Sequence, residues 1–285
     1  MSINSREICL SVALVTRNRP ETLERCLKSL RSQSFQPFEV VVSDDSDAEM
    51  AARTEAIANN WNCRYIIGPH RGLYANRNHA ALACQGTHIR TMDDDHILPE
   101  GHLKQCIKAV YSDPKSIWTT GEIGFINGKY CGTSATATQL YPSGVSGPVI
   151  DIDDNWAIAD GSTIYPQEVF QQGHRMVEWF PFGSNYLEFG AYLYYHGFRS
   201  RCIPGALVEH YANETILKRK KNISVTESQL YASICFNLYF KPNYILAAKY
   251  IFSSIRYSNF NQNLLTNLPN LIAKAQNRWQ TVKSK

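Results

Sequence analysis

Short apolar runs and amphipathic segments alternate through the first half of the chain, and this alternation constrains the fold more than any other feature. Residues 8–15 (ICLSVALV) are rich in β-branched side chains, as expected of a strand buried on both faces. Pro20 suits a first helical turn, and leucines follow it at helical spacing. Further strands are expected within 38–47, 64–72, 87–92 and 117–126, and helices at 48–60, 73–84 and 102–112. The sequence therefore predicts an α/β fold of βαβ units around a mostly parallel sheet.

Length and composition fit an ordinary globular protein. The chain has 285 residues, 44% hydrophobic and 19% charged, which is enough for one large α/β domain with a helical appendage. The apolar stretch near the N-terminus is only about eight residues long, too short for a signal peptide or a membrane span, so a cytoplasmic protein is expected. The eight cysteines stand singly without a CxxC pair, which indicates neither a zinc site nor a disulfide framework.

Charge divides the chain into an acidic body and a basic tail. Residues 212–285 contain eleven Lys or Arg and two Glu, a net charge of +9, whereas residues 1–211 contain eighteen basic and twenty-three acidic residues, a net charge of −5. Such a tail either faces anionic lipid or a polyanionic acceptor, or is simply a solvated helical surface. Pro242 is expected to divide two helices within it.

Polar or acidic turns follow three of the predicted strands. They read TRNRP after the first strand, SDDSD after the second and DDDH after the fourth. Because the carboxyl ends of parallel strands meet at one edge of a sheet, where open α/β sheets bind ligands, these turns are expected to converge. The three consecutive carboxylates of Asp93 to Asp95 repel one another, so they either lie in a solvated turn or hold a cation.

Four motifs in this order and spacing resemble family 2 glycosyltransferases with the GT-A fold. They are NRPETLERCLKSLRSQ, VVVSDDSD, ANRNHAALACQG and the aspartates at 93–95, and the resemblance extends over about residues 9–211. It implies a Rossmann-like mixed, mostly parallel sheet flanked by helices. The implied domains are a GT-A catalytic domain at 1–211, with a nucleotide-binding part at about 1–101 and an acceptor part at about 102–211, and a basic helical C-terminal extension at 212–285.

The resemblance implies a divalent cation, Mn²⁺ or Mg²⁺, at the acidic turn. Asp95 would bind the metal, and Asp93 would face the ribose or reach the metal through water. Asp94, the middle residue, would point away from the cation, although it belongs to the expected nucleotide-sugar site. His210, after the last strand, would reach the metal or the diphosphate.

The resemblance also places the nucleotide on the first loops. An acid after the second strand would accept hydrogen bonds from the base, with Asp44 favoured over Asp45. The residues expected to meet the base or diphosphate, or to add positive charge near them, are Thr16, Arg17, Arg19, Arg71 and Arg77. For each arginine alone, a surface salt bridge is favoured at least as strongly as a ligand contact.

In the second half, WAIADGSTIYPQEVF resembles the segment that lines the donor sugar and acceptor, with Asp160, Gly161 and Ser162 as candidates. The acidic pair that the family carries near the start of the following helix falls here on Asn185 and Tyr186. Glu188 is the remaining acid of that segment, so it is assigned as the base that takes the acceptor's proton. The alternative is a helix N-terminal Glu stabilised by the helix dipole.

The resulting hypothesis is an inverting, metal-dependent transfer of a sugar, with UDP-sugar favoured, to an acceptor hydroxyl in surface polysaccharide or glycolipid synthesis. The expected partners are the nucleotide sugar and a glycan or lipid-linked acceptor, without nucleic acid. The extension either contacts the inner face of the membrane peripherally or packs on the catalytic domain. The alternative, motivated by the missing acidic pair, is a catalytically silent nucleotide-sugar or glycan-binding module. A nucleotidyltransferase is disfavoured, because no glycine-rich phosphate loop with a lysine follows the first strand.

Overall fold

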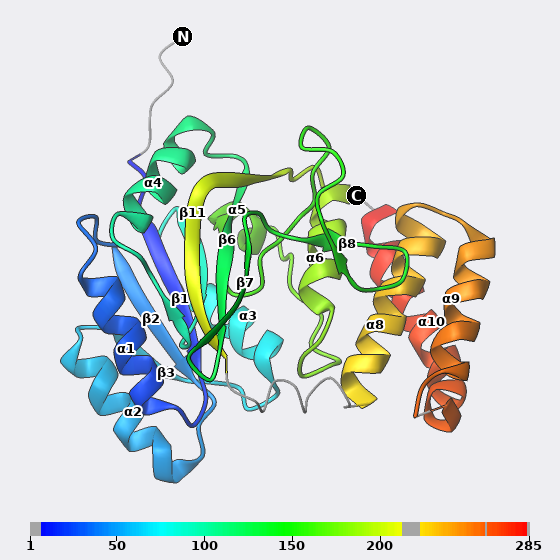
Figure 1. Ribbon diagram of the computed structural model, residues 1–285, viewed down its shortest axis with the longest axis horizontal. Coiled ribbons are helices and arrows are strands. Elements are labelled where there is room, and N and C mark those ends of the chain that lie inside the picture. Colours follow the sequence, from blue (N-terminus) through cyan, green and yellow to red (C-terminus); the bar gives the residue numbers. More distant parts are fainter. Residues whose placement is uncertain (1–6, 213–222, 260, 284–285) are drawn as a thin grey trace.

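The computed structural model describes residues 7–212, 223–259 and 261–283. Their core is a curled, mixed sheet flanked by helices (Figure 1). Its first half consists of parallel strands β1 (Leu10–Thr16), β2 (Glu39–Asp44), β3 (Arg64–Ile67) and β4 (His88–Asp93) in the order β3-β2-β1-β4. They alternate with helices α1 (Pro20–Arg31), α2 (Ala48–Asn60) and α3 (Leu73–Ala83). The predicted βαβ alternation is therefore confirmed.

The central strand β1 is buried along its whole length, and its side chains point alternately to two hydrophobic clusters. Val12 and Leu14 lie in one cluster with Leu23 and Leu27 of α1, whereas Ala13 and Val15 lie in the other with residues of α3. A period of two with both faces apolar is what a parallel strand between two helix layers requires. This double burial fixes the register of β1, so the polar turns after β1, β2 and β4 lie at one edge.

The second half of the sheet adds strands in both directions. Strand β10 (Thr163–Pro166) pairs antiparallel with β4 and with β6 (Ile117–Ile126), and β11 (Ser200–Ala212) runs parallel to β6. The short strand β5 (His96–Ile97) pairs antiparallel with the end of β11. The remaining elements of this half are α4 (His102–Ser112), β7 (Lys129–Ser134), β8 (Gln139–Leu140), β9 (Ser146–Gly147), α5 (Gln167–Gln171) and α6 (Asn185–Tyr195).

The C-terminal part is helical, as predicted. It contains α8 (Ile223–Cys235), the π-helical turn η1 (Phe236–Phe240), α9 (Tyr244–Arg256) and α10 (Asn261–Lys283). Pro242 lies between η1 and α9, and Asn243 caps α9 by accepting a hydrogen bond from the backbone N–H of Leu246. Within the described ranges, none of the helices combines the length and hydropathy needed to cross a membrane.

The C-terminal helices share a hydrophobic cluster with the sheet. Leu230 and Ile234 of α8 and Leu271 of α10 belong to the same cluster as Ala13 and Val15 of β1. One core that includes both parts means that burial alone does not separate them at residue 211. The division into a catalytic domain at 1–211 and an extension at 212–285 stays a prediction.

Candidate active site

A pocket of about 600 Å³ opens at the carboxyl ends of β1 and β4. The predicted site residues that line it are Thr16, Arg17, Arg19, Asp45, Asp93, Asp95, Asp160 and His210. They come from the turns after three parallel strands, from the loop before β10 and from the end of β11. The edge that the strand pattern indicates is thus where most of the candidate polar side chains meet.

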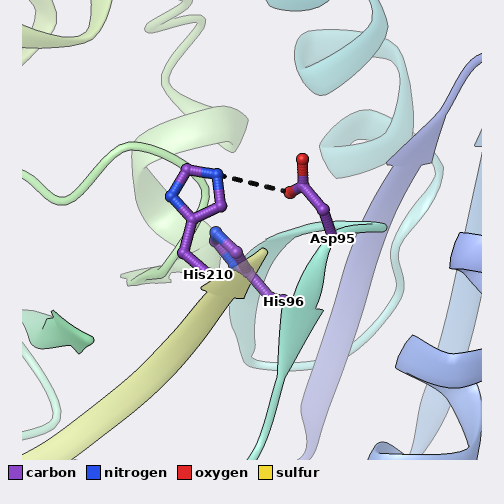
Figure 2. Close-up of side chains that lie close together, drawn as sticks. All are labelled: Asp95, His96 and His210. Atoms are coloured by element: carbon purple, nitrogen blue, oxygen red, sulfur yellow. Dashed lines mark ion pairs between the residues drawn. The ribbon is translucent and has the colours of Figure 1, made fainter. Parts of the chain in front are cut away.

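Asp95, His96 and His210 form the centre of this edge, as Figure 2 shows. His96 on β5 and His210 on β11 are register partners, so the antiparallel pair brings the acidic turn and the last strand together. One ligand atom from each of the three residues lies within 4.8 Å of the others. His210 Nε2 lies 3.7 Å from Asp95 Oδ1, and His210 Nδ1 lies 2.8 Å from Glu122 Oε1.

The electrostatics of this cluster are those of a cation site. Burial alone would raise the pKa of Asp95, but its interaction with His210 and the charge of Arg19 hold that pKa below its usual range. Burial alone would lower the pKa of His210, but the carboxylates of Asp95 and Glu122 raise it to about 11. The carboxylates of Asp95 and Glu122 therefore favour positive charge at this point.

The buried donor atoms of the cluster test whether a divalent cation fits. Asp95 Oδ1 and both ring nitrogens of His96 are buried and find no hydrogen-bond partner among the described residues. An unpartnered buried polar atom is costly, so these atoms suit a ligand that the protein alone does not supply. A carboxylate oxygen beside imidazole nitrogens is a donor set that fits a divalent metal such as Mn²⁺.

Asp94 lies behind the pocket and is fully buried. Its Oδ2 accepts hydrogen bonds from Thr16 Oγ1 at 2.6 Å and from Arg19 Nε at 3.2 Å, and burial raises its pKa to about 7. Arg19 also donates to Asp95 Oδ2 at 2.8 Å. The structure therefore corrects the expectation that Asp94 contacts the nucleotide sugar, because it instead positions the loop that carries Thr16 and Arg19.

Arg77 is also buried rather than pocket-lining, and it bridges two carboxylates. Its guanidinium forms an ion pair with Asp93 at 2.6 Å and another with Asp160. Gly161 lies against Asp93, with φ of +74° and a position where an added Cβ would come within 2.6 Å of the carboxylate. Ser162 is buried, and its Oγ accepts a hydrogen bond from Thr120 Oγ1 at 3.0 Å. Arg77, Gly161 and Ser162 thus shape the site from behind and do not line it.

Of the two acids at the end of β2, Asp45 and not Asp44 lines the pocket. Asp44 is 1% exposed, and its oxygens accept hydrogen bonds from the Ser46 backbone N–H at 2.8 Å and Tyr65 Oη at 3.1 Å. Asp45 lines the pocket and accepts a hydrogen bond from the backbone N–H of His70 at 2.9 Å. The preference for Asp44 is therefore corrected in favour of Asp45, because β2 turns the first acid into the fold and the second into the pocket.

Arg71 lies outside the pocket. Its side chain is 65% exposed and forms an ion pair with Glu178 at 3.0 Å. This is the surface salt bridge that the sequence left open as an alternative, and such exposed pairs contribute little to stability.

Glu188 is not placed to act as a base. It is fully buried in α6, and its Oε1 accepts a hydrogen bond from Arg278 Nε of α10 at 3.0 Å. Burial raises its pKa, and the charge of Arg278 offsets this only in part. Asn185, where the resemblance led us to expect an acid, donates to the backbone carbonyls of Val177 and Phe180 at 2.9 Å each. We therefore withdraw Glu188 as the catalytic residue, because its carboxylate is closed off from the pocket.

Sequence reasoning missed His96 and Glu122. His96 stands directly after the three aspartates, and that adjacency was the available signal. Glu122 is a single acid within the otherwise uncharged strand β6, and it contacts His210 only because β11 pairs in register with β6. No motif spacing reports such a cross-strand contact.

Parts of the sequence are similar to those of known proteins. The glycosyl transferase family 2 model matches residues 11–144. A relative, the GalNAc(5)-diNAcBac-PP-undecaprenol beta-1,3-glucosyltransferase of Campylobacter jejuni, is 30% identical over 101 residues, which cover 33% of this chain and 32% of the relative. The chain therefore aligns with about a third of the length of that relative.

Solved structures resemble the whole described fold. S. aureus TarS 1-349 in complex with UDP-GlcNAc has a TM-score of 0.62 at 16% identity, covering 96% of this chain and 79% of that chain. GalNAc-T7 with UDP, GalNAc and Mn²⁺ has a TM-score of 0.69 at 14% identity, covering 93% of this chain and 55% of that chain. These likenesses confirm the predicted GT-A fold.

Proposed function

Because residues 11–144 belong to glycosyl transferase family 2, we propose that this chain is a metal-dependent, inverting glycosyltransferase that uses a nucleoside diphosphate sugar. The favoured donor is a UDP-sugar, and the favoured acceptor is a hydroxyl of a glycan or lipid-linked glycan. One observation carries the proposal: Asp45, Asp95, Asp160 and His210 converge in a single pocket at the carboxyl edge of the sheet. The neighbours crystallised with UDP or UDP-GlcNAc support the donor class, and the C. jejuni relative supports the acceptor class.

Asp95 and His210 would hold the cation, with Asp93 beside them and His96 behind. The buried Oδ1 of Asp95, which accepts no hydrogen bond, and the carboxylate of Glu122 beside His210 support this assignment. Bound Mn²⁺ or Mg²⁺ would supply charge neutralisation for the departing diphosphate. The mixed oxygen and nitrogen donor set favours Mn²⁺ over Mg²⁺, which prefers oxygen ligands.

The nucleotide end of the pocket is formed by the loops after β1 and β2. Asp45 would accept hydrogen bonds from the base, because its carboxylate lines the pocket while its Oδ1 is already oriented by the His70 N–H. Arg17 and Arg19 line the same pocket and would face the diphosphate. Asp94 fixes Arg19 in that direction by pairing with its guanidinium.

The sugar end of the pocket is assigned to Asp160. Its side chain is 39% exposed, and Arg77 holds it in place from the buried side. With Glu188 withdrawn, Asp45 assigned to the base, and Asp93 and Asp95 assigned to the cation, Asp160 is the pocket carboxylate left among the lining residues, so we assign it the acceptor's proton. That proton leaves the hydroxyl as its oxygen attacks the anomeric carbon and the bond to the diphosphate breaks.

The test is nucleotide release from a panel of UDP-sugars, measured with and without Mn²⁺. One donor is expected to show turnover that requires the metal, and Asp160→Asn is expected to lower kcat by about 100-fold. The exposed loop residue Asp153 provides the matched control, since Asp153→Asn should leave kcat unchanged. Equal turnover with and without Mn²⁺ would contradict the metal requirement. An Asp160→Asn variant as fast as wild type would contradict the assignment of Asp160 as the base.

A second candidate is a module that binds a nucleotide sugar or glycan without turning it over. One observation favours it: Asn185 and Tyr186 stand where the resemblance led us to expect an acidic pair. The side chain of Asn185 donates hydrogen bonds to the backbone carbonyls of Val177 and Phe180. Under this candidate, a UDP-sugar raises the melting temperature in a concentration-dependent way, while no acceptor elicits turnover. Turnover with any acceptor excludes the module.

A further inference from the structure

Helix α9 carries an apolar stripe that the described residues leave uncovered. Its inner side packs on the core through Ala247, Ile251 and Ile255. The opposite side is exposed at positions spaced three or four residues apart, which form one stripe along a helix. The exposed residues of the stripe and its ends are Tyr244, Ile245, Ala248, Lys249, Phe252, Arg256 and Tyr257. In Figure 1, α9 lies at the outer edge of the molecule, beyond α8 and α10 as seen from the sheet.

The large apolar side chains of the stripe are highly exposed. Ile245 is 83% exposed, Tyr257 is 79% exposed and Phe252 is 63% exposed. Isolated exposed apolar residues are common, but several large ones on one helical face mark a surface that another apolar phase covers. The aromatic and aliphatic members stand on the same face, so a single flat surface would contact them together.

Positive charge is interleaved with the apolar residues. Lys249 and Arg256 belong to the same exposed face, and α9 contains no acidic residue. The guanidinium of Arg256 lies 6.0 Å from the ring of Phe252 and 5.8 Å from that of Tyr257, and Lys249 Nζ lies 5.6 Å from the ring of Tyr250. The charged groups thus stay beside the rings, where they reach anionic groups while the rings enter an apolar layer. Residues 223–283 contain one acid, Glu227, which contacts Asn267 of α10 rather than α9.

We propose that the exposed face of α9 docks on an anionic phospholipid surface. A helix of this length lies in the interface with its apolar residues among the acyl boundary and its lysine and arginine at the headgroups. A second copy of the chain fits less well, because a two-fold contact through this face would bring Lys249 and Arg256 toward the same charges of the partner. For the proposed transferase, docking would concentrate the enzyme where a lipid-linked acceptor lies; that consequence rests on the proposed function, whereas the docking does not.

The experiment is co-sedimentation of the full chain with vesicles of phosphatidylglycerol and phosphatidylcholine, compared with vesicles of phosphatidylcholine alone. Wild type is expected to bind the anionic vesicles at least tenfold more tightly, and Phe252→Glu is expected to weaken that binding at least tenfold. Phe38 is the matched control, since it is 62% exposed but lies far along the chain, just before β2. Phe38→Glu should bind the vesicles like wild type.

Two further measurements make the outcomes distinct. Lys249→Gln with Arg256→Gln should weaken binding to anionic vesicles and reduce its salt dependence, while both changes leave the fold intact. Turnover of a soluble acceptor should be the same in wild type and Phe252→Glu, so a failed transferase hypothesis does not affect the vesicle result. The proposal is overturned if wild type ignores the anionic lipid, or if Phe252→Glu binds as wild type does. It is also overturned if wild type is a dimer that Phe252→Glu dissociates while neither form binds vesicles.

Discussion

Two arginines of this protein are buried against carboxylates, and the two systems serve different ends. Arg77 bridges Asp93 and Asp160 at the floor of the pocket, and both carboxylates also line that pocket. Arg278 of α10 closes on Glu188 of α6, with a further hydrogen bond from its Nη2 to the backbone carbonyl of Arg175 at 3.0 Å. The first system holds carboxylates at a surface that a ligand reaches, whereas the second joins two helices.

The difference shows that a buried acid is a functional candidate only when one of its carboxylate oxygens accepts no hydrogen bond from the protein and can bind a ligand. Asp95, beside the first system, has a buried oxygen that accepts no hydrogen bond from the described residues. Glu188 has both oxygens within reach of Arg278, at 3.0 Å and 3.3 Å. Removing a charge should therefore affect catalysis at the first place and stability at the second.

The largest effect is expected from Asp95→Asn. The change removes a negative charge from the proposed cation site, so kcat/KM with Mn²⁺ should fall about 1,000-fold while the melting temperature stays close to that of wild type. Steady-state kinetics with a circular dichroism melt measure both quantities. If Asp95→Asn were fully active, or if it unfolded, the contrast between a catalytic carboxylate at the pocket and a stabilising carboxylate at Glu188 would be contradicted.

Arg278→Met should have the next largest effect, and on stability alone. It leaves Glu188 buried without a charge partner, which should lower the free energy of unfolding by about 3 kcal/mol. Because Arg278 does not line the pocket, kcat of the folded variant should be unchanged at a temperature well below the melt. Urea unfolding measures the free energy of unfolding, and a turnover assay measures kcat. A large loss of kcat would show that the pair of Arg278 and Glu188 contributes to catalysis.

Gly161→Ala should cause an intermediate loss. The glycine has a positive φ and an added Cβ would meet the carboxylate of Asp93, so the turn must shift. We expect about a tenfold decrease in kcat/KM with a small decrease in melting temperature. Gly173→Ala is the matched control, because Gly173 also has a positive φ but no heavy atom lies within 4 Å of its added Cβ. Equal kinetic effects of both changes would show that backbone strain alone matters.

The smallest effect is expected from Glu188→Gln. Burial raises the pKa of Glu188 above its unfolded value, so its carboxyl contributes most to stability when protonated, below that unfolded value. This contribution is lost as pH rises through the raised folded pKa. The free energy of unfolding of wild type relative to Glu188→Gln should therefore fall as pH rises from the unfolded pKa of the carboxyl through its raised folded pKa. Denaturation at several pH values measures it, and a difference that rises with pH would reverse the sign assigned here.

Much of the fold follows from sequence because its signals are local. The alternate burial of Val12 and Leu14 against Ala13 and Val15, and the helical spacing of Leu23, Leu27 and Leu30, are both visible in the sequence. Strand β5 has only two residues, which is too short for any periodicity to be detected. Strand β10 enters antiparallel between β4 and β6, an order that no local pattern reports.

The candidate site was predictable as an edge but not atom by atom. The turns after β1, β2 and β4 converge because parallel strands end together, and this brought Asp45, Asp93 and Asp95 into view. The choice between Asp44 and Asp45 depends on a single residue step, which moves a side chain from one face to another. The fate of Glu188 depends on Arg278, ninety residues away in the sequence, so no reading of its own helix reveals the pair.

The central claim is that the edge formed by Asp95 and His210 binds a divalent cation together with a nucleoside diphosphate. Calorimetric titration of UDP in the presence and absence of Mn²⁺ tests it most directly, with wild type, Asp95→Asn and Glu188→Gln compared. The account predicts that Mn²⁺ strengthens UDP binding at least tenfold in wild type and Glu188→Gln, and has no such effect in Asp95→Asn. UDP binding that is indifferent to Mn²⁺ in wild type, or equally strengthened in Asp95→Asn, would contradict it.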